Sequence, residues 1–164
     1  MAGLATYSPE DVTVIVAGLV HITGFASGTF VNVEKVLPVF RQRQSADGVV
    51  SRTHTRSDLY NLTLTLASTS DSNQVLTYMC KLDDMTRRGK FPLIIKDHSG
   101  SSLFFASQCW IESIPSLSYS EDIDSRDWTI CCYGGALNVG GNYDESSTGE
   151  DIFNIGSSIL AGVV

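Results

Sequence analysis

Residues 61–66 read Asn-Leu-Thr-Leu-Thr-Leu, and this alternation of polar and apolar side chains decides the fold class. Successive side chains of a β-strand point to opposite faces, so Leu62, Leu64 and Leu66 are predicted to face inward. Similar runs predict further strands at residues 12–17, 19–22, 31–34, 91–96, 103–111 and 126–133. The first two form a hairpin that turns near Gly18, or one long bent strand. The chain is therefore predicted to be mainly β.

One helix is predicted among these strands, at about residues 71–88. Asp71 can cap its N-terminus, and Gln74 three residues later completes an arrangement like a capping box. Gly89 is expected to end the helix in a left-handed conformation. An apolar stripe at steps of three and four residues supports the helix: Val75, Met79, Leu82 and Met85.

The segment 38–58 is long and polar and lies between two predicted strands. Loops of this length are uncommon inside compact domains and are usually functional. Asp47-Gly48 is a hairpin-turn signal, so the segment is predicted to form an extended β-arm. The segment is locally basic, because two aspartates, Asp47 and Asp58, accompany four arginines: Arg41, Arg43, Arg52 and Arg56.

The net charge of −7 is concentrated in the last quarter of the 164-residue chain. Residues 119–164 hold one base, Arg126, and eight acids: Glu121, Asp122, Asp124, Asp127, Asp144, Glu145, Glu150 and Asp151. Such a chain is not expected to grip DNA, because that grip requires clustered lysine and arginine. Charged residues make up only 18% of the sequence, against about 25% in ordinary soluble domains. This composition suits a subunit that is largely covered by copies of itself.

The N-terminal residues show no secretory signal, because they lack a basic region and turn acidic at Glu10. The longest apolar run, residues 12–20, is less than half of a membrane span. Without a secretion signal, the four cysteines are expected to be reduced thiols, and synthesis is placed in a cytoplasm.

No catalytic or metal-binding constellation is found in the sequence. His21, His54 and His98 share no spacing, and the adjacent Cys131 and Cys132 would point to opposite faces of a strand. The acidic stretch 121–127 lacks the residue order of a calcium loop and is interpreted as a solvated turn. We therefore expect no enzyme activity, no catalytic residue, no metal and no cofactor.

The order of features over roughly residues 6–140 resembles the tail tube proteins of contractile-tailed bacteriophages, which are related to the type VI secretion tube protein. The resemblance begins with Thr6-Tyr7-Ser8 before an apolar strand and continues with Ser45-Ala46-Asp47-Gly48 in a long arm. It includes a Leu/Thr-alternating strand that closes with Thr69-Ser70 and Asn73 before the helix. It ends with a strand-turn-strand near residues 114–119, followed by the strand that holds Trp128.

The resemblance implies a β-sandwich or barrel of antiparallel strands with one flanking helix, as a domain at residues 1–140. It also implies hexameric rings joined edge to edge and stacked into a hollow tube, through which DNA passes without specific binding. Implied partners are other copies of the chain, the tail sheath protein, the baseplate or tube initiator and the tail terminator. The protein would assemble in the host cytoplasm and belong to the virion, as part of the phage tail.

Residues 141–164 are predicted to be a C-terminal extension docked on the same or a neighbouring subunit. They contain apolar groups that suit a free tail poorly: Ile152, Phe153, Ile155, Ile159 and Leu160.

Two hypotheses follow from the charges. Acidic residues that line the bore would repel the phosphates of DNA. The basic arm would reach the next ring, with inter-ring contact candidates Arg41, Arg43, Arg52 and Arg56 and with Asp47 and Gly48 at its tip. Two alternatives stay open, a type VI secretion tube protein and a monomeric β-barrel that binds a small apolar ligand.

Overall fold

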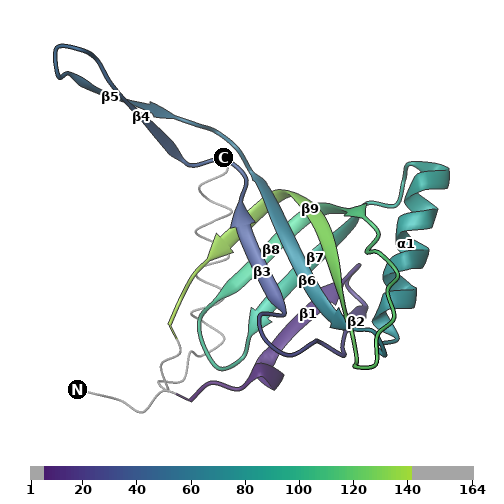
Figure 1. Cartoon of the computed structure of the whole chain (residues 1–164). Coiled ribbons are helices and arrows are strands. Elements are labelled where there is room, and N and C mark those ends of the chain that lie inside the picture. Colours follow the sequence, from purple (N-terminus) through teal and green to yellow (C-terminus); the bar gives the residue numbers. More distant parts are fainter. Residues whose placement is uncertain (1–5, 142–164) are drawn as a thin grey trace. The chain divides into compact units, whose positions relative to one another are not determined.

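The computed structural model describes residues 6–141, and the termini 1–5 and 142–164, with the predicted C-terminal docking groups, lie outside the described residues (Figure 1). The fold is mainly β, with antiparallel strands in a sandwich-like arrangement and one α-helix. The sheet does not close into a barrel, because the hydrogen-bonded order of the described strands ends at β2 and at β3. The chain divides into two compact units, which are described in turn.

The first unit contains β1 (Val12–Val16), β2 (Val20–Ile22), β7 (Phe91–Asp97) and the beginning of β8 (Leu103–Ser113). A short 3-10 turn, Pro9–Asp11, precedes β1. Strand β1 pairs antiparallel with both β2 and β7, and Val14 and Val16 of β1 are fully buried. Ala17 and Gly18 have positive φ angles, so β1 and β2 form the hairpin near Gly18 rather than one bent strand.

The second unit contains β3 (Val31–Lys35), β6 (Leu59–Ala67) and most of β9 (Ser125–Asn138), with the second part of β8. Strand β6 lies between β3 and β9 and pairs antiparallel with both. Leu62, Leu64 and Leu66 are fully buried, which confirms the inward face predicted from the alternation. Opposite them on β9 lie Ile130, Trp128 and Arg126.

Helix α1 (Ser72–Thr86) is anchored to the second unit through its first turn. Trp128 is almost fully buried, and its Nε1 donates a hydrogen bond to Oδ1 of Asn73 at 2.9 Å. The Nδ2 atom of Asn73 in turn donates to the backbone carbonyls of Ala67 and Ser70. Asn73 therefore joins the end of β6, the first turn of α1 and the indole of Trp128.

The ends and the buried face of α1 differ from the sequence prediction. Asp71 stands at the N-cap position but makes no side-chain capping hydrogen bond. The left-handed residue at the C-terminus is Arg87, with φ 56°, rather than Gly89. The backbone N–H of Gly89 instead donates to the Asp83 carboxylate, which closes the turn without a left-handed glycine. The buried positions of α1 are Ser72 and Leu76, whereas Leu82 and Met85 of the predicted stripe are exposed.

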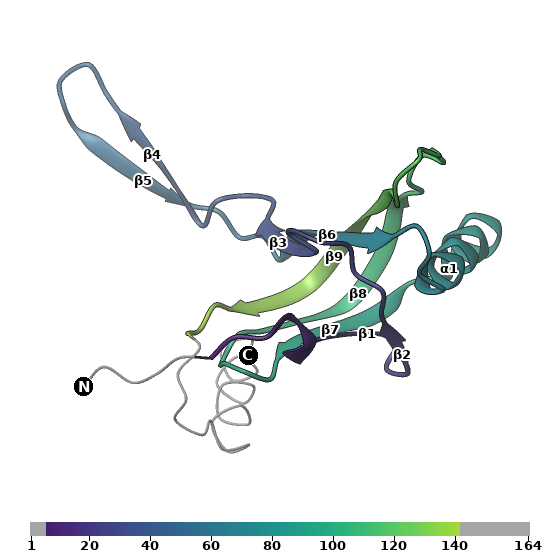
Figure 2. The ribbon, with the colours of Figure 1, turned by 60° about the horizontal axis from the view of Figure 1, so that its bottom comes forward.

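A separate two-stranded sheet leaves the second unit between β3 and β6. Its strands are β4 (Phe40–Gln44) and β5 (Val50–His54), paired antiparallel. Every residue from Phe40 to His54 is exposed. In Figures 1 and 2 this hairpin extends away from β3 and β6 as an arm. The predicted β-arm is therefore present, and residues 40–54 are called the β4–β5 arm below.

Candidate functional site: a basic arm and an acidic loop

The tip of the β4–β5 arm is a tight three-residue turn. The backbone N–H of Gly48 donates to the carbonyl of Ser45 at 2.9 Å, and the N–H of Ser45 donates to the carbonyl of Val49 at 3.0 Å. Gly48 has φ +85°, a left-handed angle that glycine adopts without the strain of a Cβ atom. The turn signal at Asp47-Gly48 is therefore located correctly, at the outer end of the arm.

The pairing of the strands divides the arm into two faces, because residues directly opposite in an antiparallel pair lie on the same side. Arg41 and Arg43 lie opposite Thr53 and Ser51 and form a basic face. Phe40, Arg52 and His54 belong to the other face. There the Arg52 guanidinium lies 4.3 Å from the centre of the Phe40 ring, which in turn packs against His54.

Charges in the arm are largely unneutralised within the described part of the chain. No ion pair to Arg41, Arg43 or Arg52 occurs among residues 6–141, and Arg56 lies beyond β5 at the base of the arm. A hydrogen bond from Ser45, with further backbone hydrogen bonds, lowers the pKa of the Asp47 carboxyl below its ordinary value. The structure thus brings five of the six predicted contact residues onto the arm, and their contact role stays a prediction.

Replacing Gly48 by valine is expected to disturb the arm without unfolding the protein. No atom obstructs a side chain at Gly48, but its positive φ is strained for a β-branched residue, at a cost of about 1–2 kcal/mol. Because the arm is fully exposed, the midpoint of thermal unfolding should stay unchanged, while amide exchange at residues 45–49 should accelerate. Gly28→Val, at an exposed glycine outside the arm, is the matched control and should leave exchange in the arm unaltered.

A second surface lies between β8 and β9, in residues 114–124, called the β8–β9 loop. Arg126 is only 8% exposed, although it is charged. Its guanidinium donates hydrogen bonds to the backbone carbonyls of Ser116 and Ser118, at 3.3 and 2.9 Å, and to the Ser118 hydroxyl. It also lies 5.9 Å from the centre of the Tyr119 ring. One buried arginine therefore fixes the conformation of an otherwise exposed loop.

The β8–β9 loop presents acidic and apolar side chains together. The hydroxyls of Ser118 and Ser120 donate to the Asp124 carboxylate, whereas the exposed carboxylates of Glu121 and Asp122 accept no hydrogen bond within residues 6–141. Four apolar side chains are also exposed, and three of them by more than two thirds: Ile114, Leu117, Tyr119 and Ile123. Residues 118–124 line a shallow hollow of about 210 Å³ with Ser68. Residues 121–127 were predicted to be a solvated turn before a strand; residues 121–123 are exposed as expected, whereas 125–127 belong to β9 and Arg126 is buried.

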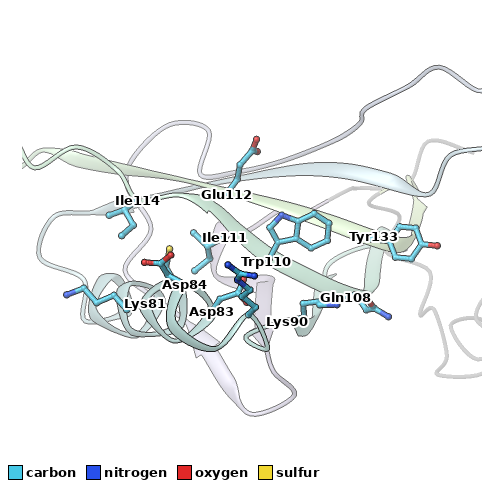
Figure 3. A pocket seen from close by; sticks show the side chains of 12 residues that line it. Lys81, Asp83, Asp84, Lys90, Gln108, Trp110, Ile111, Glu112, Ile114 and Tyr133 are labelled. Carbon is cyan, nitrogen blue, oxygen red and sulfur yellow. The ribbon is translucent and has the colours of Figure 1, made fainter.

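A larger groove of about 730 Å³ lies between α1 and β8 (Figure 3). Its basic residues Lys81, Arg87 and Lys90 are balanced by acidic ones, and Trp110 supplies an aromatic wall. The one cysteine in the lining is Cys80, and burial, then Asp84 and Asp83, raises the pKa of its thiol. Cys80 is therefore a neutral thiol near pH 7 and a poor nucleophile.

The other three cysteines are buried, and all four are free. A hydrogen bond with Cys109, together with burial, raises the pKa of the Cys132 thiol far above its ordinary value. Within residues 6–141 no three histidine, cysteine or acidic side chains gather in a way that could hold a metal ion. These cysteines act as small apolar core residues in the described structure. Over the same residues, no helix combines the length and apolar character needed to span a bilayer.

The fold is similar to that of two solved terminator proteins of contractile injection systems. One is the tube terminating cap of the anti-feeding prophage, with a TM-score of 0.53 and 13% identity, covering 85% of this chain and 95% of the cap. The other is the sheath/tube terminator of an extracellular contractile injection system, PVC, in its extended state. Its TM-score is 0.51 at 13% identity, covering 84% of this chain and 100% of the terminator. At these identities the similarity establishes the fold.

The sequence itself identifies a family of phage structural proteins, although no family model matches the chain. The chain is 35% identical over 159 residues to Structural protein ORF10 of Pseudomonas phage KPP10, and the alignment covers 92% of each protein. The chain belongs to the family of this structural protein.

Proposed function

We propose that the chain is the tube subunit of a contractile phage tail, forming hexameric rings that stack around a bore through which DNA passes. The observation that carries this proposal is the β4–β5 arm, in which every residue from Phe40 to His54 is exposed. The arm adds nothing to the core of its own unit. An element of this kind is expected to act by contact with another molecule.

The surface chemistry of the arm supports contact with further protein. Phe40, Val49 and Val50 are exposed apolar residues on a hairpin whose arginines form no ion pair within residues 6–141. Such exposed apolar side chains can be buried by contact with another protein. Membership in a family of phage structural proteins favours a phage assembly over a type VI secretion tube. The open sheet gives no support to the ligand-binding barrel.

The charge distribution suits a conduit for DNA. The chain is acidic overall, and acidic residues that line the bore, as this proposal requires, would repel phosphates rather than bind them. In this proposal the tube contacts the sheath protein outside, an initiator at the baseplate and a terminator at the other end. The protein would then be part of the virion, assembled in the host cytoplasm.

A tube terminator is the second candidate, and the fold similarity to two terminator caps favours it. A terminator and a tube subunit differ in whether rings continue to stack. The arm favours continued stacking, because a projecting element on every copy can contact the next ring.

Negative-stain electron microscopy of the purified chain at two concentrations tests the proposal. A tube subunit should form hollow tubes that lengthen as the concentration rises. Single rings that never stack, at any concentration, would favour the terminator and contradict the tube. A uniform monomer at high concentration would contradict both.

A further inference from the structure

The β4–β5 arm and the β8–β9 loop lie at opposite ends of one strand. Thr55–Asp58 connect the arm to Leu59, where β6 begins. At the other end of β6, Ala67 lies opposite Ser125, and the N–H of Ser68 donates to the carbonyl of Asp124 at 2.8 Å. The nine residues of β6 span about 27 Å. The arm extends away from β6 (Figures 1 and 2), so the two surfaces of one copy face different neighbours.

The two surfaces are complementary in charge. The arm carries Arg41, Arg43 and Arg52 with no ion pair among the described residues, and its one acid is Asp47 at the tip. The loop has no base and carries Glu121, Asp122 and Asp124, of which the first two accept no hydrogen bond within residues 6–141. Opposite potentials of this kind favour contact between two copies and disfavour arm against arm or loop against loop.

The two surfaces also match in apolar character. Phe40, Val49 and Val50 are exposed on the arm. Leu117, Tyr119 and Ile123 are exposed on the loop, at 73%, 84% and 75%. Interfaces gain stability from buried apolar and aromatic groups inside a polar rim, and each surface offers both. The groove beside α1 offers no such match, because its bases and acids balance.

The loop is held in place before any contact is made. The hydrogen bonds from Arg126 to Ser116 and Ser118, and those from Ser118 and Ser120 to Asp124, fix its backbone. A surface that is already ordered loses less conformational entropy on binding than a mobile loop does.

We propose that the β4–β5 arm of one copy docks on the β8–β9 loop of the next copy along the tube axis. This inference rests on the proposed function for the existence of the assembly and names the surface that receives the arm. Because donor and receiver lie at opposite ends of β6, the contact is head-to-tail. A head-to-tail contact that does not close repeats indefinitely and gives an open filament.

Charge reversal on the arm, on the loop, and on both together tests the proposed contact between arm and loop. Arg41→Glu with Arg43→Glu on the basic face of the arm, and Glu121→Lys with Asp122→Lys on the loop, should each raise the protein concentration needed for tubes about tenfold or more. The four changes together restore the attraction with the signs exchanged and should recover most of the loss. Arg88→Glu with Lys96→Glu changes the net charge by the same amount and sign as the arm variant, and it should assemble as the unmodified chain does.

The outcomes distinguish a failure of the arm–loop contact from a failure of the proposed function. If the unmodified chain forms no tubes, the proposed function fails first. If the unmodified chain forms tubes and the loop variant assembles equally well, the proposed arm–loop contact is wrong. The same holds if the combined variant assembles no better than the arm variant and the loop variant. In both cases the proposed tube function is unaffected.

A cross-link between copies gives a measurement independent of charge. Val49→Cys and Ile123→Cys are assembled singly and as a mixture, then treated with a short bismaleimide. A dimer should form in the mixture alone. A dimer in either single variant, or none in the mixture, would contradict the proposed arm–loop contact. The unmodified chain controls for cross-linking through its own four cysteines.

Discussion

Replacing Trp128 by alanine is expected to lower the free energy of unfolding of the second unit by about 4 kcal/mol. Trp128 is among the largest fully buried side chains and lies opposite Leu64 of β6. Its removal leaves a cavity beneath α1 and also removes the hydrogen bond to Asn73. The midpoint of urea unfolding, followed by circular dichroism on unassembled protein, should fall by about 2 M.

Trp128→Phe separates the two contributions. Phenylalanine retains most of the buried apolar surface but donates no hydrogen bond, so Oδ1 of Asn73 loses its partner, at a cost of about 1–2 kcal/mol. Amide exchange in the first turn of α1 should accelerate in both variants. A loss below about 1 kcal/mol for Trp128→Ala would contradict the anchoring of α1 by this residue.

The strands could be predicted because one face of each is buried. Burial forces apolar residues to recur at every second position, as at Leu62, Leu64 and Leu66, and this pattern is visible in the sequence. The arm could be predicted for a different reason. Asp47-Gly48 carries its own turn chemistry, and the strands beside it need no core to pair.

The features that the sequence did not reveal depend on contacts between distant residues. At the end of α1, Arg87 takes the left-handed conformation and its N–H donates to the backbone carbonyl of Asp83, while the Asp83 carboxylate accepts from the N–H of Gly89. Leu76 is buried, whereas Leu82 and Met85 of the predicted stripe are exposed, and the hydrogen bond to Trp128 is made by Asn73 in the first turn of α1. An apolar periodicity shows that a helix has a face, but not which part of that face is covered.

The ordered conformation of the β8–β9 loop could not be predicted, for the same reason. Its acids and serines are typical of a solvated turn, and its order comes from Arg126, which lies outside the loop on β9. An isolated arginine in an acidic quarter of the chain was visible, but its burial was not. Burial of a charged side chain depends on tertiary structure, and a single sequence does not show it.

Removing the β4–β5 arm is expected to abolish tubes while leaving the fold intact. The N–H of Thr55 donates to the carbonyl of Val39 at 2.8 Å, so the two ends of the arm are already adjacent. Asn-Gly in place of residues 40–54 therefore closes the chain with a two-residue turn. Because every deleted residue is exposed, the free energy of unfolding should change by less than about 1 kcal/mol.

Sedimentation and electron microscopy should then show folded protein without tubes, even at concentrations where the unmodified chain assembles fully. Gln42→Ala with Gln44→Ala, in an arm of full length, is the control and should assemble. Tubes from the shortened chain would contradict the role of the arm.

Mixing the shortened chain with the unmodified chain tests whether the β8–β9 loop receives the arm. The shortened chain lacks the arm but keeps the β8–β9 loop with Glu121 and Asp122. If the arm of one copy docks on that loop, the shortened chain can still receive an arm at the end of a growing tube, but it offers none to the next copy. Substoichiometric amounts should therefore shorten the tubes. Lengths that do not change with the ratio would mean that the arm is needed for assembly but is received elsewhere.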